Sequence, residues 1–184
     1  MDKPINFRPI TETQRLVLRE FELNDAQNIW ELNSDPEVIK YTGDPPFEKI
    51  EKAREFLENY EEYKKNGFGR WAVITKRTNS FIGWCGLKLN EQNLVDLGYR
   101  FFKKEWNKGY ATEAAAASLE YGFMHLNLNE IIGRVAVENK GSIKVLEKLS
   151  MTYWKMDSCK GIENSLYYRI TKEQYLQNIK KRRF

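Results

Sequence analysis

The sequence is short of the side chains that build metal and disulfide sites. It contains one histidine, His125, and two cysteines, Cys85 and Cys159. This inventory leaves no plausible zinc cluster or disulfide framework, and two lone cysteines suit the reducing cytoplasm. We therefore expect no metal site. A catalytic triad could only use His125, which stands in an apolar stretch where a helix-flanking histidine is the more ordinary role.

Long apolar runs and low-complexity segments are missing as well. No run approaches the roughly 20 residues of a membrane span, and the N-terminal segment MDKPINFRPITETQ lacks the apolar centre of a secretory signal. An aromatic content of 14% excludes a disordered chain. The net charge of +4 fits an anionic ligand or simple solubility, and the basic tail at 180–183 is more simply a solvated terminus than a nucleic-acid site. We expect one cytoplasmic domain over residues 1–184, with no membrane or nucleic-acid partner.

Hydrophobic periodicity predicts an alternation of strands and helices. Strands are expected over residues 15–19, 71–75, 81–89, 94–102, 131–137, 151–157 and 166–170. Helices are expected after Asn24 as N-cap, from residue 50 to the Asn66–Gly67 stop, over 110–126 and 141–149, and from 172. This order, without a repeat or a linker, predicts a single α/β domain with a mixed sheet.

The most informative segment, residues 97–114, runs from a predicted strand through a short loop into a helix. Backbone N–H groups at a helix N-terminus lack intrahelical partners, and the helix dipole favours an anion there. Gly109 lets a phosphate approach the backbone closely, and Lys103, Lys104 and Lys108 flank the loop. These features predict a site for a diphosphate or a similar anion. An ordinary strand-to-helix turn with solvated lysines is the alternative.

Three motifs, in order along the chain, resemble the GNAT superfamily of N-acetyltransferases. The segment 106–114, W-N-K-G-Y-A-T-E-A, resembles its acetyl-CoA loop in the form usual in the ribosomal-protein (Rim-type) branch. Residues 135–149 resemble that branch's V-x-x-x-N-x-x-S-x-x-V-L-E-K-L motif, and residues 13–19 its first strand, T-x-R-L-x-L-R. Together the motifs cover about residues 10–170. The resemblance implies a single-domain α/β GNAT fold, with a mixed and mostly antiparallel central sheet flanked by helices.

The resemblance also implies acetyl-CoA as co-substrate and assigns residues to it. Backbone groups of the strand would bind the pantetheine arm at Tyr99, Arg100, Phe101 and Phe102. Backbone N–H groups of the loop would hold the pyrophosphate at Trp106, Asn107, Lys108, Gly109, Tyr110, Ala111 and Thr112. Asn139 and Ser142 would lie near the thioester. From the residues alone, Asn139 could equally cap the following helix, with Ser142 in its first turn.

Two side chains are the main candidates for proton transfer, and a third is a weaker one. Many superfamily members place a tyrosine, the acid for the leaving thiolate, where this chain has Leu146, which leaves Ser142 as the candidate acid. A thiol of pKa about 8.5 needs little help to leave. Asp96 is the candidate base, because Rim-type relatives carry a carboxylate at a similar place; an exposed strand acid is the alternative. Glu113 is a weaker candidate, since an acid in a first helical turn already has a structural reason.

Amine chemistry favours one class of acceptor. At pH 7 a lysine of pKa about 10.4 is neutral in roughly 1 of 2,500 molecules, and an N-terminal amine of pKa about 7.7–8.0 in roughly 1 of 10. We expect acetyl transfer to a primary amine, preferably a protein N-terminal α-amine. The alternatives are a small amine (an antibiotic or a polyamine) and a non-catalytic acyl-CoA-binding or RNA-associated module. Four aromatic residues could line the amine site or belong to the core: Trp30, Tyr41, Trp71 and Trp84.

Overall fold

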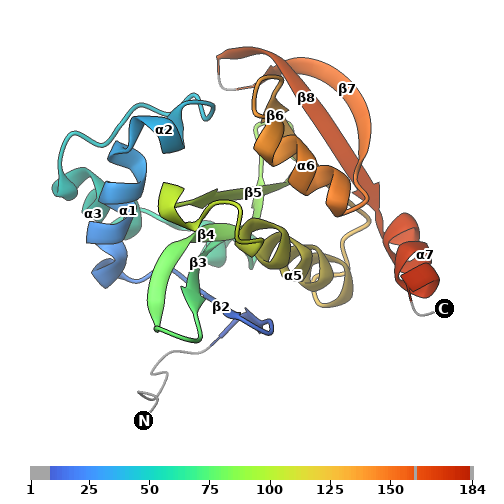
Figure 1. Cartoon of the computed structure of the whole chain (residues 1–184), viewed down its shortest axis with the longest axis horizontal. Coiled ribbons are helices and arrows are strands. Elements are labelled where there is room, and N and C mark those ends of the chain that lie inside the picture. The colour runs from blue at the N-terminus through green and yellow to red at the C-terminus, as the bar shows by residue number, and fades with distance from the viewer. Residues whose placement is uncertain (1–8, 160, 183–184) are drawn as a thin grey trace.

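A single mixed sheet organises the molecule. The computed structural model describes residues 9–159 and 161–182, whose strands follow the order β1-β2-β3-β4-β5-β6-β8-β7 (Figure 1). The strands are β1 (Thr11–Glu12), β2 (Leu16–Arg19), β3 (Arg70–Thr75), β4 (Ser80–Leu89), β5 (Val95–Phe101), β6 (Glu130–Ala136), β7 (Thr152–Cys159) and β8 (Ile162–Thr171). Neighbouring strands are antiparallel except β5 and β6. The expected α/β fold with a mostly antiparallel sheet is confirmed.

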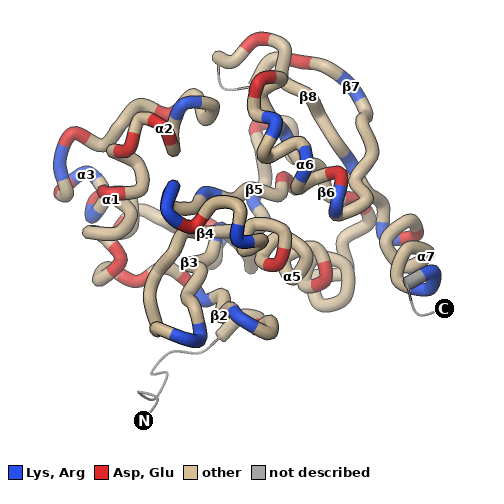
Figure 2. Tube along the Cα trace, in the orientation of Figure 1, with Lys and Arg blue, Asp and Glu red and all other residues tan. Residues whose placement is uncertain are grey.

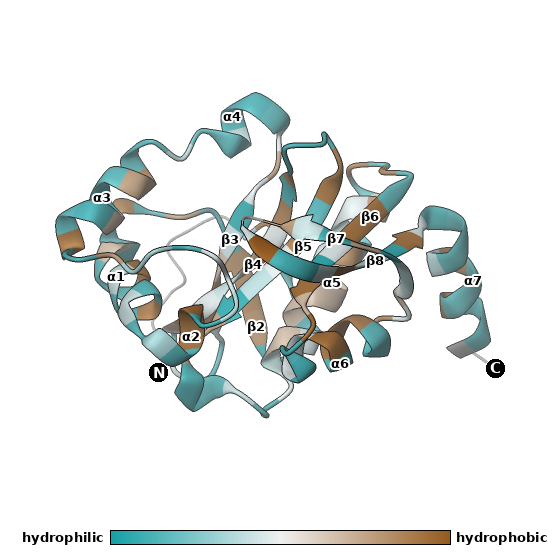
Figure 3. Ribbon diagram, turned by 90° about the horizontal axis from the view of Figure 1, so that it is seen from above, coloured by the Kyte–Doolittle hydropathy of each residue, from teal (hydrophilic) through white to brown (hydrophobic). Residues whose placement is uncertain are grey.

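Helices lie on both sides of this sheet. They are η1 (Leu23–Asp25), α1 (Ala26–Ser34), α2 (Pro36–Ile39), α3 (Ile50–Glu58), α4 (Glu62–Asn66), η2 (Lys103–Glu105), α5 (Tyr110–Met124), α6 (Lys140–Lys148) and α7 (Lys172–Arg182). Because side chains alternate along a strand, Leu16 and Leu18 pack in the main core with α5, while Val17 contacts a cluster on the opposite face. Figure 3 shows apolar residues along the strands and mostly hydrophilic ones on α4 and α7.

Helix α5 fills the centre of the main core and aims its N-terminus at the end of β5. Its small residues Ala114 and Ala115 are fully buried, as are Leu119 and Phe123. A Cβ on Gly122 would come within 2.7 Å of the Ile131 side chain, so the helix lies close to β6. This packing fixes where the connecting loop after β5 can run.

The predicted helix from residue 50 to Asn66 is two helices in the structure. Helix α3 ends at Glu58 and α4 begins at Glu62. Two tyrosines explain the break, because both turn their hydroxyl groups to β3: Tyr60 accepts the N–H of Arg70 at 2.6 Å, and Tyr63 donates to the Arg70 carbonyl. The predicted stop is confirmed, since Gly67 ends α4 with φ 75°.

The prediction that Asn24 caps the first helix is wrong. Asn24 lies inside η1, and α1 begins at Ala26. The cause is the buried carboxylate of Asp25, which accepts both guanidinium N–H groups of Arg19 at 2.7 Å and the Glu22 N–H at 2.9 Å. These bonds tighten the chain into a 3₁₀ turn and tie it to β2.

Charge is distributed without a dominant sign. Figure 2 shows acidic and basic residues interspersed along most elements. In the described part of the chain, no helix is long and apolar enough to span a bilayer, and no group of three His, Cys, Asp or Glu side chains could hold a metal ion. Arg183, the end of the basic tail, lies outside the described residues.

Candidate active site

The site begins where the parallel strands β5 and β6 separate. Among the described residues they pair only at Asp96–Ile132 and Leu97–Gly133, although β5 continues to Phe101 and β6 to Ala136. Beyond Leu97, β5 keeps its antiparallel partner β4 but has no ladder on its β6 side. An extended ligand can therefore lie along this edge and use the backbone groups that a neighbouring strand would otherwise take.

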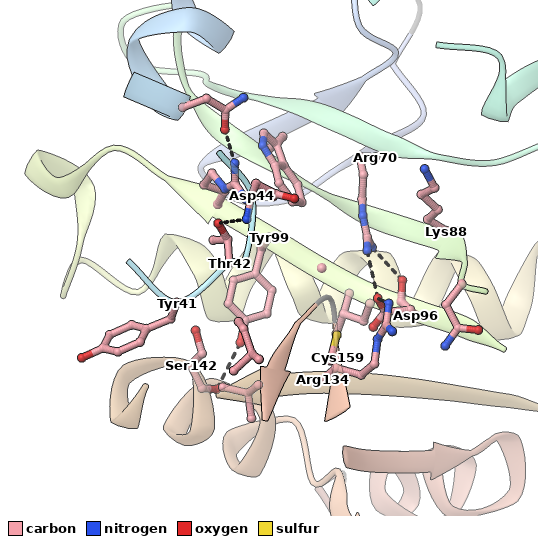
Figure 4. A pocket seen from close by; sticks show the side chains of 18 of the residues that line it. Tyr41, Thr42, Asp44, Arg70, Lys88, Asp96, Tyr99, Arg134, Ser142 and Cys159 are labelled. Atoms are coloured by element: carbon pink, nitrogen blue, oxygen red, sulfur yellow. Dashed lines mark hydrogen bonds and ion pairs between the residues drawn. The ribbon is translucent and has the colours of Figure 1, made fainter. Parts of the chain in front are cut away.

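Tyr99 and helix α6 border the opening. The Tyr99 hydroxyl donates to the carbonyl of Ser142 at 3.1 Å, in the first turn of α6 (Figure 4). The Asn139 side chain accepts the N–H of Ser142 at 3.1 Å and caps the helix, so the structural role considered for Asn139 is confirmed. Both Asn139 and Ser142 also line the cavity described below. Burial raises the pKa of Tyr99, and the Ser142 hydroxyl, which also lies close to the Tyr99 side chain, acts in the opposite direction.

The loop between β5 and α5 presents a bare helix N-terminus. Gly109 precedes α5 with φ 81° and offers no side-chain acceptor to the first turn. Asn107 also adopts a left-handed conformation, with φ 60°. The first-turn N–H groups at 110–112 have no acceptor among residues 9–159 and 161–182 and can bind an anion. A Cβ at Gly109 would stand in the approach, 3.3 Å from Arg15 Nη2. These residues fit the diphosphate of CoA.

Several side chains of the predicted cofactor segment contact other parts of the protein. Trp106, 41% exposed, donates its indole N–H to the Phe101 carbonyl at 2.9 Å and folds the loop back on β5. Phe101 packs in the main core, and Phe102 packs against Phe81 with ring centroids 6.2 Å apart. Lys108 binds Glu105 at 3.0 Å. The loop would hold an anion by its backbone rather than by its lysines.

A cavity of about 630 Å³ opens between α6, β5 and the loop at 41–47 (Figure 4). One part is aromatic, with Phe21, Tyr41, Phe47, Phe56, Tyr60 and Trp84 among its lining residues. The charged lining residues are Asp44, Arg70, Lys88, Glu91, Asp96, Arg100 and Arg134. Of the four aromatic candidates from the sequence, Tyr41 and Trp84 line this cavity. Trp71 is buried in the main core, and Trp30 packs among α1 and α3 side chains.

Asp96 lies on the cavity wall and is bound by two arginines. Its Oδ2 atom is 3.0 Å from Arg134 Nη2 and 3.3 Å from Arg70 Nη2, and Figure 4 shows the two guanidinium groups reaching it from opposite sides. Asp96 is 7% exposed, so the alternative of an exposed strand acid is wrong. Its Oδ1 atom is buried without a hydrogen-bond partner among the described residues. One carboxylate oxygen thus keeps an unused acceptor position beside the cavity.

Arg100 was predicted as a backbone contact for the cofactor, and its side chain turns into the same cavity. It donates to Asn33 of α1 and, at 2.6 Å, to Asp44. Burial lowers the pKa of Arg100, against the opposing effect of Asp44. The guanidinium lies 5.3 Å from the ring of Trp84. Sequence reasoning missed this arginine-rich wall because its members come from separate strands; the one available signal was the alternation that places Asp96 and Arg100 on one face of β5.

Two further candidates lie away from the cavity lining. Glu113 accepts hydrogen bonds from Thr13 and Arg15 on the far side of the loop, so its weaker candidacy as a base is not supported by its position. His125 is exposed at the C-terminus of α5 and stacks on Tyr121 at 5.0 Å, as expected for a helix-flanking histidine. Neither lies among the residues lining the cavity.

Comparison with known proteins gives one consistent family. A family model described as an acetyltransferase (GNAT) domain matches residues 15–152. The N-acetyltransferase p20 of Bacillus licheniformis is 39% identical over 141 residues, which are 75% of this chain and 79% of that protein.

Solved structures agree with this result. An acetyltransferase of the GNAT family from Bacillus anthracis superposes with a TM-score of 0.74 at 34% identity, covering 88% of this chain and 98% of that one. A spermidine N-acetyltransferase from Vibrio cholerae, in complex with CoA and spermine, shares the fold with a TM-score of 0.74 at 23% identity, over 89% and 99% of the two chains.

Proposed function

Since the chain belongs to the GNAT family of acetyltransferases, we propose that its acceptor is the α-amine of a peptide or protein N-terminus. Acetyl-CoA-dependent N-acetyl transfer follows from the family itself. The relatives include spermidine acetyltransferases as well as N-acetyltransferases named without an acceptor, so the ribosomal-protein branch stays a prediction. The choice of acceptor depends on the cavity.

One observation carries the choice of an α-amine over a polyamine: among the described residues, every carboxylate that lines the cavity is already bound to arginine. Asp44 binds Arg100 at 2.6 Å, Glu91 binds Arg134 at 2.6 Å, and Asp96 lies between two arginines. A polyamine brings two or more ammonium groups, each of which needs an acidic partner when it leaves water. A single amine beside an apolar side chain fits this wall and the aromatic part of the cavity better.

In the proposed reaction, acetyl-CoA supplies the acetyl thioester. The Oδ1 atom of Asp96 takes the proton that the amine loses as the new C–N bond forms, directly or through water. The hydroxyl of Ser142 donates a proton to the sulfur as the C–S bond breaks, and a water molecule returns a proton to the serine oxygen. An α-amine suits a modest base, because a useful fraction of it is neutral near pH 7.

A competition between acceptors tests the proposal. The enzyme is given acetyl-CoA at pH 7 and three acceptors at equal concentration. They are a peptide with a free N-terminus, the same peptide with a blocked N-terminus and an internal lysine, and spermidine. Mass spectrometry then locates the acetyl groups. We expect the free α-amine to react at least about tenfold faster than the lysine, in line with its larger neutral fraction, and spermidine to react slowest. Preferential acetylation of spermidine would overturn the acceptor assignment.

Replacing Ser142 with alanine is expected to lower kcat modestly, by about ten- to a hundredfold. A proton donor typically contributes about 10²–10⁴, and a thiolate needs less help than most leaving groups. The variant keeps the two hydrogen bonds that the Ser142 backbone makes with Asn139 and Tyr99, and it removes only the hydroxyl and its interaction with the Tyr99 side chain. Steady-state thiol release measures the effect. Turnover equal to that of the unmodified enzyme would leave Ser142 a structural residue.

A further inference from the structure

The first-strand motif has no part in the reaction proposed above, yet its Arg15 wraps around the loop before α5. Arg15 Nη1 donates to the carbonyl of Lys108 at 2.9 Å, and Nε donates to Glu113 Oε2 at 2.6 Å. The guanidinium carbon lies 4.6 Å from the centre of the Tyr110 ring. One side chain between β1 and β2 thus contacts the loop just before Gly109, just after it, and one turn into α5.

Glu113 holds Arg15 in this position. Its Oε1 atom accepts the Thr13 hydroxyl at 2.5 Å and the backbone N–H of Arg15 at 3.0 Å. Burial alone would raise the pKa of the Glu113 carboxyl, but the hydrogen bonds from Thr13 and Arg15 outweigh it and lower the pKa below its usual range. The carboxylate therefore stays charged at neutral pH. Arg15 is oriented before any ligand arrives, which reduces the entropy cost of binding.

The remaining amino group of Arg15 faces the open side of the loop. Nη2 makes no hydrogen bond to the described residues and lies 3.3 Å from the position that a Cβ on Gly109 would take. This is the side on which the absence of a side chain lets an anion reach the backbone. The Arg15 side chain is 44% exposed, so its charge is accessible to a ligand that enters there.

We propose that Arg15 is a binding residue for the diphosphate of CoA: Nη2 donates to a phosphate oxygen at the N-terminus of α5, while Nε and Nη1 hold the loop in shape. Arginine suits this double task, because its planar fork offers several donors in fixed directions. Its charge also adds to the helix dipole at the same point. The proposal rests on assigning loop 106–112 to the diphosphate and does not depend on the acceptor.

Calorimetry without any amine tests the proposal. In Arg15→Gln we expect the Kd for CoA to rise about tenfold, as for the loss of a charge-assisted hydrogen bond. Dephospho-CoA keeps the diphosphate and lacks the ribose 3′-phosphate. Its Kd should rise by the same factor in Arg15→Gln. Acetyl-pantetheine, which lacks the diphosphate and the 3′-phosphate, should bind Arg15→Gln and the unmodified protein with the same Kd in the same calorimetric experiment. Arg15→Lys keeps the positive charge but lacks the planar guanidinium group. Its affinity for CoA should lie between those of the unmodified protein and Arg15→Gln.

Arg77→Gln is the matched control, since Arg77 is an exposed arginine in the turn between β3 and β4. It removes the same charge and should leave CoA affinity unchanged. The proposal is overturned if Arg15→Gln binds CoA with normal affinity. It is also overturned if the substitution weakens the binding of acetyl-pantetheine as much as that of CoA, or if it leaves the affinity for dephospho-CoA unchanged. Because the calorimetric measurements contain no acceptor, a wrong acceptor assignment leaves their outcome unaffected.

Discussion

Replacing Gly109 with valine is expected to weaken CoA binding at least about 100-fold, which corresponds to about 2.7 kcal/mol. Two effects add. Gly109 has φ 81°, a conformation that a β-branched residue adopts only with strain, and a Cβ there would lie 3.3 Å from Arg15 Nη2. The side chain would occupy the space through which a phosphate reaches the N–H groups of α5. Calorimetric titration with CoA measures the affinity.

Gly67 offers a matched control for the backbone strain. It has φ 75°, with nothing within 4 Å of a Cβ placed on it, and it ends α4 rather than opening α5. Gly67→Val should lower the thermal midpoint much as Gly109→Val does, and should still bind CoA normally. Normal CoA affinity in a folded Gly109→Val variant would contradict the assignment of the loop.

Changing Asp96 to asparagine should lower kcat by about 100-fold or more near pH 6.5, within the usual contribution of a general base. The deficit should shrink as the pH rises, because a growing share of the acceptor is neutral and needs no base. For an α-amine the deficit should level off near pH 8, and for a lysine only near pH 10. One pH–rate series therefore tests the base and the class of acceptor together.

Asp44→Asn is the control for losing a carboxylate beside an arginine. Asp44 binds Arg100 in the same cavity, 2.6 Å from its Nη2, and has no role in proton transfer here. Its deficit should be the same at every pH. A constant deficit from pH 6 to 9 in Asp96→Asn would show that Asp96 acts only by charge or position. No deficit at all would leave it as the counter-charge of Arg70 and Arg134.

Hydrophobic periodicity and turn residues were enough to predict most of the helices and strands. The three consecutive strands before α5 and the helix from Tyr110 follow from alternation, turn residues and the apolar stripe, and the structure has them at nearly the predicted bounds. The tyrosines that split α3 from α4, and the Arg19–Asp25 pair that delays α1, were not predictable in the same way. Their partners lie on neighbouring elements six to ten residues away in the chain, and hydrophobic periodicity does not report hydrogen bonds between elements.

The sequence by itself determined the family, the order of the elements and the loop that fits a diphosphate, because each depends on residues close together in the chain. Only the tertiary structure decided the surroundings of Asp96, since Arg70 and Arg134 reach it from β3 and β6. It likewise brought Arg15 of the first motif to Gly109 of the loop, although about half of the chain separates them in sequence. Sheet order sets which distant side chains share a face, and that order comes from the packing of the whole core rather than from any one segment.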